Sequence, residues 1–281
     1  MTACGRCNFD VADNLARCPC CNADAGYPNV KLARAEAAAL AARVSKAKDD
    51  AKTRGAETAL VEFEKALEST LAVVNVDIGF VHQLLGSDKV LYTAYGKLIA
   101  SGARTAGAPE NDQQRTGVDG ILFGSWGGEI AFAALSIDGR GLGSYGAITI
   151  ELKELTISER ASVLEENSYV FVRRHKIVPG DAIPAGYRAP WRERRDVGTA
   201  KLANRVHATT TSADHAKLVL SSDGINRDKD DFIEVHIYGP FNCHAIQRIT
   251  VLERPKDAGE QMRLEGIKRM ATAKGIAWRE P

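Results

Sequence analysis

The sequence has no long apolar run and no apolar leader. No stretch approaches the roughly 20 apolar residues that a membrane-spanning helix needs. The first ten residues, MTACGRCNFD, lack the basic and then apolar order of a signal peptide. The sequence therefore predicts a cytoplasmic protein that contacts no membrane.

The chain also lacks an excess of charge of either sign. Its 281 residues include 37 Lys and Arg against 36 Asp and Glu, a formal net charge of +1. This balance excludes a net positive charge that would attract the whole protein to nucleic acid or membranes, so any site for a polyanion has to be a local patch. Hydrophobic residues make up 44% of the chain, which is enough to bury a core. From the length we expect a domain of about 200 residues and a smaller attached segment.

Common catalytic and nucleotide-binding motifs are absent as well. The sequence has no Gly-x-Ser-x-Gly, no His-Glu-x-x-His and no Gly-Lys-Ser/Thr, so it gives no support to a hydrolase, a zinc protease or a nucleotide-binding loop of those classes. The glycine clusters GSWGG and GRGLG lack the spacing of a dinucleotide-binding fingerprint. They predict tight turns between antiparallel strands.

Cysteine is scarce except at the N-terminus, where five of the six cysteines lie within the first 21 residues. Two Cys-x2-Cys pairs separated by ten residues match a zinc ribbon, in which each pair offers two thiolates to one tetrahedral ion. We predict this ribbon over residues 1–27, with zinc ligands Cys4, Cys7, Cys18 and Cys21. Cys20 is an alternative to Cys21. Nucleic-acid reading, protein docking and a purely structural role all stay open for the ribbon.

Residues 28–70 are rich in alanine and charge, which predicts helices. Pro28 and Asn29 indicate the start of the first helix, and Gly55 is expected to break the run in two. The thin stripe of small residues is typical of a helical linker or hairpin that lies on a neighbouring surface. A coiled-coil contact for self-association or a protein partner is the alternative.

Residues 71–281 mix strands and helices. A strand followed by a short helix is expected after Leu71, residues 105–120 read as a polar loop, and Tyr169–Arg174 read as a strand. Gly-punctuated strands fill the middle of this region, and an amphipathic helix is expected over Lys256–Lys274. The pattern predicts an α+β domain with a split antiparallel sheet and flanking helices.

The segment DFIEVHIYGP, residues 231–240, reads as a strand that ends in a Gly-Pro turn. Alternation places its aliphatic residues on one face, which predicts the core side. The other face carries four different side chains: Phe232, Glu234, His236 and Tyr238. By composition alone, this face fits the wall of a cleft and the solvated face of an edge strand equally well.

The run FIEVHIYGPFNCHAIQRI resembles the catalytic-glutamate strand of ADP-ribosyltransferase-like domains in bacterial toxins and phage-encoded proteins. In those domains Glu, any residue, Gln or His, Ile, any residue and Gly precede a short helix. Residues 145–171 resemble a second block of the same domains, which has Tyr-Gly, then Arg-Ala-Ser, then an acidic or amide residue and Ser. The matching positions are Arg160, Ser162, Asn167 and Ser168.

The resemblance implies an enzyme that cleaves NAD and transfers ADP-ribose to a macromolecular acceptor, as a toxin or phage-defence effector. Glu234 would hold the ribose 2′-hydroxyl and stabilise the cationic sugar, and Ser162 would orient the cofactor or the neighbouring backbone. The cofactor contacts implied are Tyr92, Tyr95, Arg160, Asn167, Ser168 and His236.

Two positions depart from the family pattern. The first core strand offers Tyr92 and Tyr95 where the family carries His or Arg, and these tyrosines fit half-buried core positions equally well. Phe232 stands where many members that modify arginine or guanine carry Glu or Gln. Those acceptor classes are therefore not supported by the sequence.

Residues 175–198 form a proline-containing, arginine-rich segment that is a candidate for contacts with phosphate or stacked bases. The residues predicted to bind the acceptor are Arg188, Trp191, Arg192, Arg194 and Arg195. The alternative is a loop whose arginines pair with nearby acids. Two other functional classes also stay open for the whole chain: a zinc-ribbon nucleic-acid-binding protein without catalysis, and a structural or assembly protein on the same scaffold.

Overall fold

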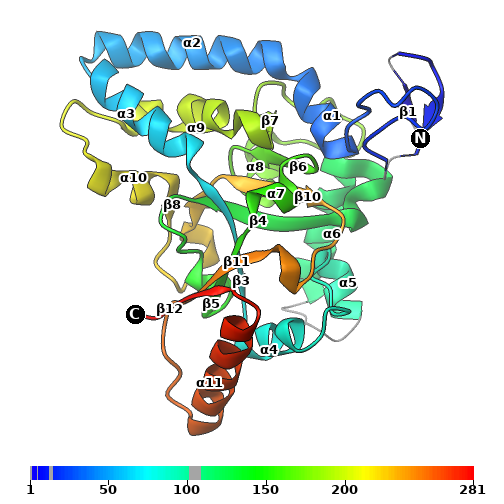
Figure 1. The fold of residues 1–281 in the computed structure, drawn as a ribbon. Helices are drawn as coiled ribbons and strands as arrows, with labels where there is room; N and C mark the ends of the chain where they lie inside the picture. The colour runs from blue at the N-terminus through cyan, green and yellow to red at the C-terminus, as the bar shows by residue number, and fades with distance from the viewer. Residues whose placement is uncertain (1, 5, 13–14, 101–108) are drawn as a thin grey trace.

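The computed structural model describes residues 2–4, 6–12, 15–100 and 109–281, and it describes the backbone alone for Thr2, Tyr95, Ala100 and residues 109–114. Figure 1 shows a central sheet with helices on both sides. The helices of residues 28–70 run along one side, the C-terminal helix lies on the opposite side, and the N-terminal ribbon projects at one end.

Eight strands form the main sheet in the order β12-β11-β5-β3-β4-β10-β6-β7. Neighbouring strands are antiparallel except for β11 and β12, which are parallel. The sheet consists of β3 (Leu71–Val76), β4 (Ile130–Ser136), β5 (Ile148–Leu152), β6 (Ala161–Leu164), β7 (Arg188–Pro190), β10 (Glu234–Tyr238), β11 (Ile246–Val251) and β12 (Ala277–Arg279). The prediction of a mixed domain with a large, mostly antiparallel sheet is confirmed.

Strand β3 joins two halves of this sheet. Its first residues, Leu71 to Val73, pair with β4, and its later residues, Val73 to Val76, pair with β5. Strand β4 meanwhile pairs with β10 along residues 130–134. The pairing between β3 and β4 thus ends at Val73, where the sheet divides into β12-β11-β5 and β4-β10-β6-β7.

The helices are α1 (Pro28–Ala35), α2 (Ala37–Thr53), α3 (Glu57–Glu68), α4 (Ile78–Gly86), α5 (Tyr95–Ala100), α6 (Pro109–Phe123), α7 (Glu154–Ile157), α8 (Ser168–His175), α9 (Arg194–Leu202), α10 (Ser212–Val219) and α11 (Ala258–Ala273). Two-residue strands complete the fold: β1 (Thr2–Ala3) and β2 (Asp10–Val11) pair, as do β8 (Leu220–Ser221) and β9 (Asp231–Phe232). Among the residues described, no helix is long and apolar enough to cross a membrane.

Two local predictions are wrong. Most of the expected polar loop at residues 105–120 is helix α6, and its first four residues lie outside the described part of the chain. Among the described side chains of α6, the buried apolar ones are Val118, Leu122 and Phe123, near its C-terminal end. Residues 109–114 are polar apart from Pro109, so the segment reads as polar overall. The GSWGG cluster, expected as a hairpin turn, is a 3-10 helix over Gly124–Glu129.

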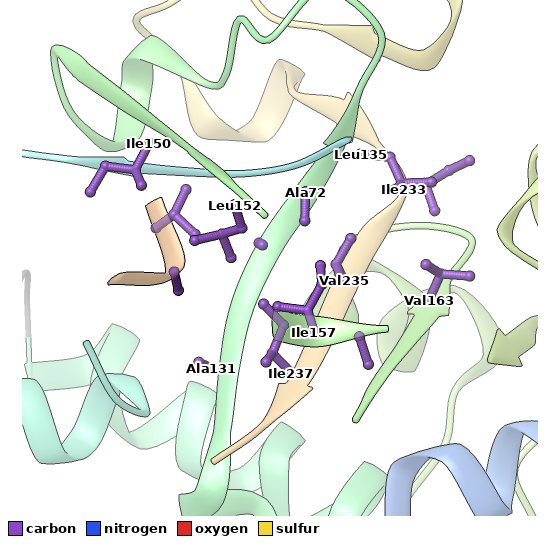
Figure 2. Packing of buried hydrophobic residues seen from close by; sticks show 14 of the residues in the cluster. Ala72, Ala131, Leu135, Ile150, Leu152, Ile157, Val163, Ile233, Val235 and Ile237 are labelled. Carbon is purple, nitrogen blue, oxygen red and sulfur yellow. The ribbon is translucent and has the colours of Figure 1, made fainter. Parts of the chain in front are cut away.

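The core lies on the aliphatic face of β10, as predicted. Ile233, Val235 and Ile237 are fully buried and belong to the largest apolar cluster. Figure 2 shows them among aliphatic side chains from neighbouring strands, including Leu135 and Val163. Burying such side chains contributes about 1.5–3 kcal/mol each, so the register of β10 is strongly fixed and its other face has to carry Glu234 and His236.

The helices of residues 28–70 are part of this domain and not a free linker. Gly55 separates α2 and α3 with a φ of +69°, which confirms the predicted break. Leu60, Phe63 and Leu67 of α3 belong to the same apolar cluster as the sheet. The buried face of α3 is therefore not available for a coiled-coil contact. Leu32, Ala35 and Ala42 of the small-residue stripe on α1 and α2 are exposed, so for that stripe the coiled-coil contact stays a prediction.

Two buried polar residues fasten this segment to the sheet. Asn29 Nδ2 donates to the Arg160 carbonyl at 3.1 Å and to the His236 carbonyl at 2.9 Å. Glu36 Oε1 accepts from Arg188 Nε at 2.5 Å, and Glu36 Oε2 accepts the N–H groups of residues 186–188. Both partners of the Glu36–Arg188 ion pair are more than 90% buried. Such a pair fixes the position of the helical segment on β7, because neither charged group can exchange its partner for water.

Glu36→Gln tests this attachment. The change leaves the Arg188 guanidinium buried without its counter-charge, so we expect the free energy of unfolding to fall by about 3 kcal/mol or more. The matched control is Glu62→Gln, because Glu62 forms an exposed pair with Lys65 and its loss should cost no more than about 0.5 kcal/mol. Chemical denaturation measures both variants. A Glu36→Gln protein as stable as the wild type would contradict the proposed anchoring.

Candidate functional site

The four predicted zinc ligands come together in the N-terminal ribbon. The Sγ atoms of Cys4 and Cys21 are 3.6 Å apart, those of Cys7 and Cys18 are 3.5 Å apart, and all four lie within 4.8 Å of one another. A tetrahedral zinc ion with four thiolates sets the sulfurs about 3.8 Å apart. The Arg6 N–H donates to Cys4 Sγ at 3.4 Å, a contact that stabilises the thiolate that a metal needs. The cluster can thus bind a metal and fits zinc.

The two Cys-x2-Cys turns have the same backbone path. The N–H of Asn8 donates to the Cys4 carbonyl and the N–H of Asn22 donates to the Cys18 carbonyl, both at 2.9 Å. Asn8 and Asn22 adopt left-handed φ values of 58° and 55°, a conformation that asparagine tolerates better than most residues. The repeated unit in the sequence is therefore Cys-x2-Cys-Asn. Cys20 is exposed and lies outside the four-cysteine group.

Glu234 lies on an interior strand and not on an edge. Strand β10 pairs with β4 on one side and β6 on the other. Glu234 is 4% exposed and His236 is 1% exposed. The solvated-edge interpretation is therefore wrong, and the sheet buries a carboxylate that requires hydrogen-bond donors.

Three donors converge on one oxygen of Glu234. Its Oε2 accepts from the Ser168 N–H at 2.9 Å, from the Ser168 hydroxyl, and from His236 Nε2 at 3.0 Å. Its Oε1 has a longer contact, 3.4 Å from Asn167 Nδ2. The protein thus fixes the carboxylate through Oε2 and leaves Oε1 as the oxygen with capacity for a further donor or a cation.

His236 supports this arrangement in one tautomer. Its Nε2 lies 3.0 Å from Glu234 and 3.2 Å from the Ser168 hydroxyl, while its Nδ1 is buried with no hydrogen-bond partner among the described residues. A hydrogen on Nδ1 would be buried without an acceptor, so the pattern assigns the neutral form with the hydrogen on Nε2. Phe123 and Phe132 pack edge-on against the imidazole and hold the ring in place.

The N-terminus of helix α8 supplies the donors to Glu234. Asn167 caps this helix, because its Oδ1 accepts the N–H of Tyr169 at 3.0 Å. The prediction of a strand over Tyr169–Arg174 is therefore wrong: these aromatic and β-branched residues are helical because the cap and the buried contacts of Phe171 outweigh their strand preference. The cap brings Asn167 and Ser168 to Glu234, and these two predicted site residues do lie together.

A cleft opens beside Glu234. A small pocket of about 70 Å³ and a larger cleft of about 1210 Å³ adjoin there. Their shared lining consists of Arg115, Phe132, Tyr145, Asn167 and Glu234. The small pocket also contacts Val73 and Val74 of β3 and Ala133 of β4, so it lies at the junction between the two halves of the sheet.

Arginines gather around the larger cleft. Arg115, Arg173, Arg174 and Arg227 all line it. Arg173 donates to the Tyr169 hydroxyl at 3.2 Å, and Arg227 donates to the Ser144 carbonyl at 3.1 Å. These two hydrogen bonds go to neutral groups, so they leave both positive charges available to attract an anionic ligand.

Asn75 places the loop that carries Tyr145. Its Oδ1 accepts the Leu142 N–H at 2.7 Å and its Nδ2 donates to the Gly146 carbonyl at 3.0 Å. Gly146 has a φ of +153°, and a Cβ on it would lie 2.4 Å from the Val76 carbonyl. Only glycine fits this close approach to β3, which explains why glycine follows Tyr145 in the sequence. The same approach holds the loop in the position at which Tyr145 lines the cleft.

Arg160 and Ser162 lie beside the site but do not line either cavity. Arg160 donates from one guanidinium nitrogen to the carbonyls of residues 238–240, at 2.7, 3.0 and 2.9 Å. Ser162 is 1% exposed, and its hydroxyl accepts from Asn29. Both residues therefore hold the backbone around β10. The cofactor contact expected for Arg160 is not supported, and of the two roles expected for Ser162 the geometry favours the backbone.

The predicted tyrosines have different outcomes. Tyr92 lines the small pocket, yet it is only 5% exposed and stacks on Phe241 with ring centroids 4.7 Å apart. It is thus a core residue with one edge at the pocket. The side chain of Tyr95 lies outside the described part of the chain.

The arginine-rich segment is mostly structural. Trp191 is 1% exposed and its Nε1 donates to Glu154, and Arg194 is 7% exposed and donates to the carbonyl oxygens of Trp191 and Glu68. Arg188 is buried against Glu36. These three residues cannot present a surface to a polyanion, which corrects their predicted role as acceptor contacts.

The remaining two arginines of the segment are more exposed, but each has an acidic partner. Arg192 pairs with Glu159, and Arg195 pairs with Glu68 at 2.7 Å. The alternative in which the arginines pair with nearby acids therefore describes the whole segment.

Sequence reasoning missed two charged residues of the cleft, Arg115 and Asp119 on α6. They lie four residues apart, on one face of a helix that was expected to be a loop. Asp119 Oδ1 is buried with no hydrogen-bond partner among the described residues. Burial raises the pKa of Asp119 to about 6, with Arg115 opposing the rise and Glu234 adding to it.

The ribbon predicts a measurable metal content. The double variant Cys4→Ser/Cys7→Ser removes two of the four thiolates, so it should lose one equivalent of zinc per chain relative to the wild type. Elemental analysis after extensive dialysis measures this loss. Cys20→Ser is the matched control, because Cys20 is exposed and outside the group. Full zinc retention in the double variant would contradict the ribbon.

Asp119 predicts a pH dependence of stability. Its pKa in the folded protein, about 6, exceeds the ordinary value of 3.8, so the folded state binds the extra proton and stability is lost as the pH rises from about 4 to 6. Asp119→Asn abolishes this loss. The variant should gain stability relative to the wild type across that window, by on the order of 1 kcal/mol or more.

Thermal unfolding of both proteins between pH 4 and 7 measures this difference. Asp228→Asn is the control, since Asp228 is an exposed carboxylate on the same cleft. A constant difference between Asp119→Asn and wild type across the window would show that Asp119 titrates normally.

No protein-family model matches the sequence, and no curated protein matches it at a significant level. The function therefore has to be inferred from the chemistry of the residues. The features that carry such an inference are the fixed carboxylate of Glu234, the cleft beside it, and the four-cysteine ribbon.

Proposed function

We propose that the protein is an NAD-dependent ADP-ribosyltransferase with a zinc-binding N-terminal ribbon. The observation that carries the proposal is the buried Glu234 carboxylate, which three donors fix through Oε2 on an interior strand and which lines a large cleft. The mostly antiparallel sheet, divided at β3, is compatible with the ADP-ribosyltransferase-like fold that the sequence resemblance implies.

The proposed chemistry uses the negative charge of Glu234. Cleavage of the nicotinamide–ribose bond leaves positive charge on the ribose, and a fixed carboxylate beside that sugar stabilises the transition state by several kcal/mol when water is excluded. Oε1 accepts the ribose 2′-hydroxyl and faces the developing cation. Ser168 and His236 keep the carboxylate from rotating away, so the stabilisation is already in place when the bond breaks.

The cleft also fits the rest of NAD. Arg173 and Arg227 are placed to attract the pyrophosphate, because both line the cleft and their hydrogen bonds described above go to neutral groups. Phe132 and Tyr145 add aromatic surface to the lining for a flat nicotinamide or adenine ring. Each ring already has an arginine guanidinium over it, Arg115 at 4.4 Å and Arg227 at 4.5 Å from the ring centroid. The cleft volume of about 1210 Å³ leaves room for part of an acceptor as well.

Asp119 is the proposed base for the acceptor. Phe232 lines the small pocket with an apolar ring that packs with Val73 and Leu142, so it supplies neither a base nor a hydrogen-bond acceptor. Asp119 lines the cleft together with Glu234, and its pKa of about 6 leaves it mostly ionised at neutral pH while close enough to that pH to take a proton. The acceptor is a nucleophilic group on a protein or nucleic acid. The resemblance to toxin and phage-encoded domains makes an effector the proposed biological role.

Glu234→Gln tests the proposal. The amide keeps the shape of the side chain but removes its charge, so NAD binding should survive while the rate of nicotinamide release falls about a hundredfold at saturating NAD. The measurement is nicotinamide release with and without cell extract as a source of acceptor. Asp228→Asn, which removes an exposed charge from the same cleft, is the matched control and should keep near wild-type activity.

Melting temperatures of the variants control for folding. A folded Glu234→Gln protein that releases nicotinamide at the wild-type rate would overturn the assignment of Glu234. Absence of nicotinamide release from the wild type under all acceptor conditions would overturn the proposed activity itself.

A further inference from the structure

Within the described residues, one group of metal-ligating side chains lies outside the ribbon. It consists of Asp88, Cys243 and His244, whose ligand atoms all lie within 4.8 Å of one another. Asp88 follows helix α4. Cys243 and His244 lie in a short 3-10 helix, Cys243–Ala245, between β10 and β11. None of the three lines the cleft around Glu234, so the group is separate from the proposed active site.

The three side chains already meet around Asp88. Cys243 Sγ is 3.1 Å from Asp88 Oδ1, and His244 Nε2 is 3.2 Å from Asp88 Oδ2. Thiolate, imidazole and carboxylate ligands of one tetrahedral zinc ion lie about 3.4–3.6 Å apart. Asp88 thus already holds one oxygen near each of the other two ligand atoms, and all three ligand atoms are close enough to surround one ion after local adjustment.

The backbone around the group is held in place. Asn242 joins the two segments, because its Nδ2 donates to the Asp88 carbonyl at 3.1 Å and its Oδ1 accepts the His244 N–H at 3.1 Å. Cys243 is 1% exposed, whereas Asp88 and His244 are exposed. One ligand is thus anchored in the core and the other two face solvent, where an ion can enter.

We propose that Asp88, Cys243 and His244 form a second metal site, for a divalent ion of the zinc class. One sulfur, one nitrogen and one oxygen ligand suit a borderline-soft ion and do not suit calcium or magnesium. Binding displaces the thiol proton of Cys243 to solvent, so a thiolate and a carboxylate neutralise the two charges of the ion. Three protein ligands leave the fourth position to water, and the exposed side of the group provides that water.

Two lysines lie beside this site, and one of them contacts a ligand atom. Lys274 Nζ donates to Asp88 Oδ1 at 2.9 Å, and Lys153 Nζ donates to the His244 carbonyl at 2.9 Å. The ammonium of Lys274 contacts a carboxylate oxygen that the ion needs, so its charge opposes metal binding. Removal of this charge should tighten binding by about tenfold. A purely structural Cys–Asp–Lys network would show no such gain.

The test uses the full chain, stripped of metal by a chelator and titrated with Zn²⁺ against a chromophoric competitor. His244→Ala should bind one equivalent fewer than the wild type at the lower-affinity step, and Cys243→Ser should show the same loss. His207→Ala is the matched control, because His207 is also exposed but lies away from the group. Lys274→Met should bind the same number of equivalents as the wild type, with the second about tenfold tighter.

Cobalt provides an independent readout that does not depend on the ribbon. With Co²⁺ as the probe, the ribbon thiolates contribute the same charge-transfer band to the wild type and to His244→Ala. The difference spectrum, wild type minus His244→Ala, should therefore show the band of the Cys243 thiolate. His244→Ala truncates an exposed side chain, so it tests the site even if Cys243→Ser does not fold. Equal zinc equivalents in the wild type and His244→Ala, or unchanged affinity in Lys274→Met, would overturn the second site.

Discussion

The site depends on one interaction, the hydrogen bonds between the Glu234 carboxylate and the N-terminus of α8. The aliphatic residues of β10 occupy the core, so the alternation of the strand forces Glu234 to the other face, and the neighbouring strands β4 and β6 bury it there. A buried carboxylate without donors would be strongly unfavourable. Ser168 meets this requirement because its N–H and its hydroxyl both donate to Oε2. The other oxygen, Oε1, has only the longer contact with Asn167, a residue of the cleft lining.

The same rule, that buried charges need partners, explains the arginine-rich segment. Arg188 is buried because Glu36 of the helical segment pairs with it. Arg194 is buried because backbone carbonyls and Thr70 accept its hydrogen bonds. These contacts tie the junction of α1 and α2 to β7 and the end of α3 to α9. The positive charges that remain around the cleft come from other segments, which places the attraction for an anionic ligand beside Glu234.

The ribbon is connected to strand β10. Tyr27, at the end of the ribbon, stacks on Tyr238 of β10 with ring centroids 5.4 Å apart, and Asp24 pairs with Arg34 of α1 at 3.1 Å. Asn29, just after Tyr27, donates to the His236 carbonyl of β10 and to the Arg160 carbonyl just before β6. A change at the cysteine cluster therefore acts on residues that contact the strand carrying Glu234, which gives the proposed zinc a structural link to the cleft.

Local rules in the sequence determined the cysteine ligands, the break at Gly55, and the core face of β10, because metal-ligand spacing, glycine and strand alternation act within a few residues. The tertiary structure decided the rest. Asn167 caps α8 next to a glutamate 67 positions away, and α6 is helical although its first half has a polar sequence. Arg115 and Asp119 reach the cleft only through that helix, and Arg160, Ser162 and Arg188 turned inward because their partners come from distant segments. Burial and pairing across the sheet are long-range properties, so no local pattern could assign these residues.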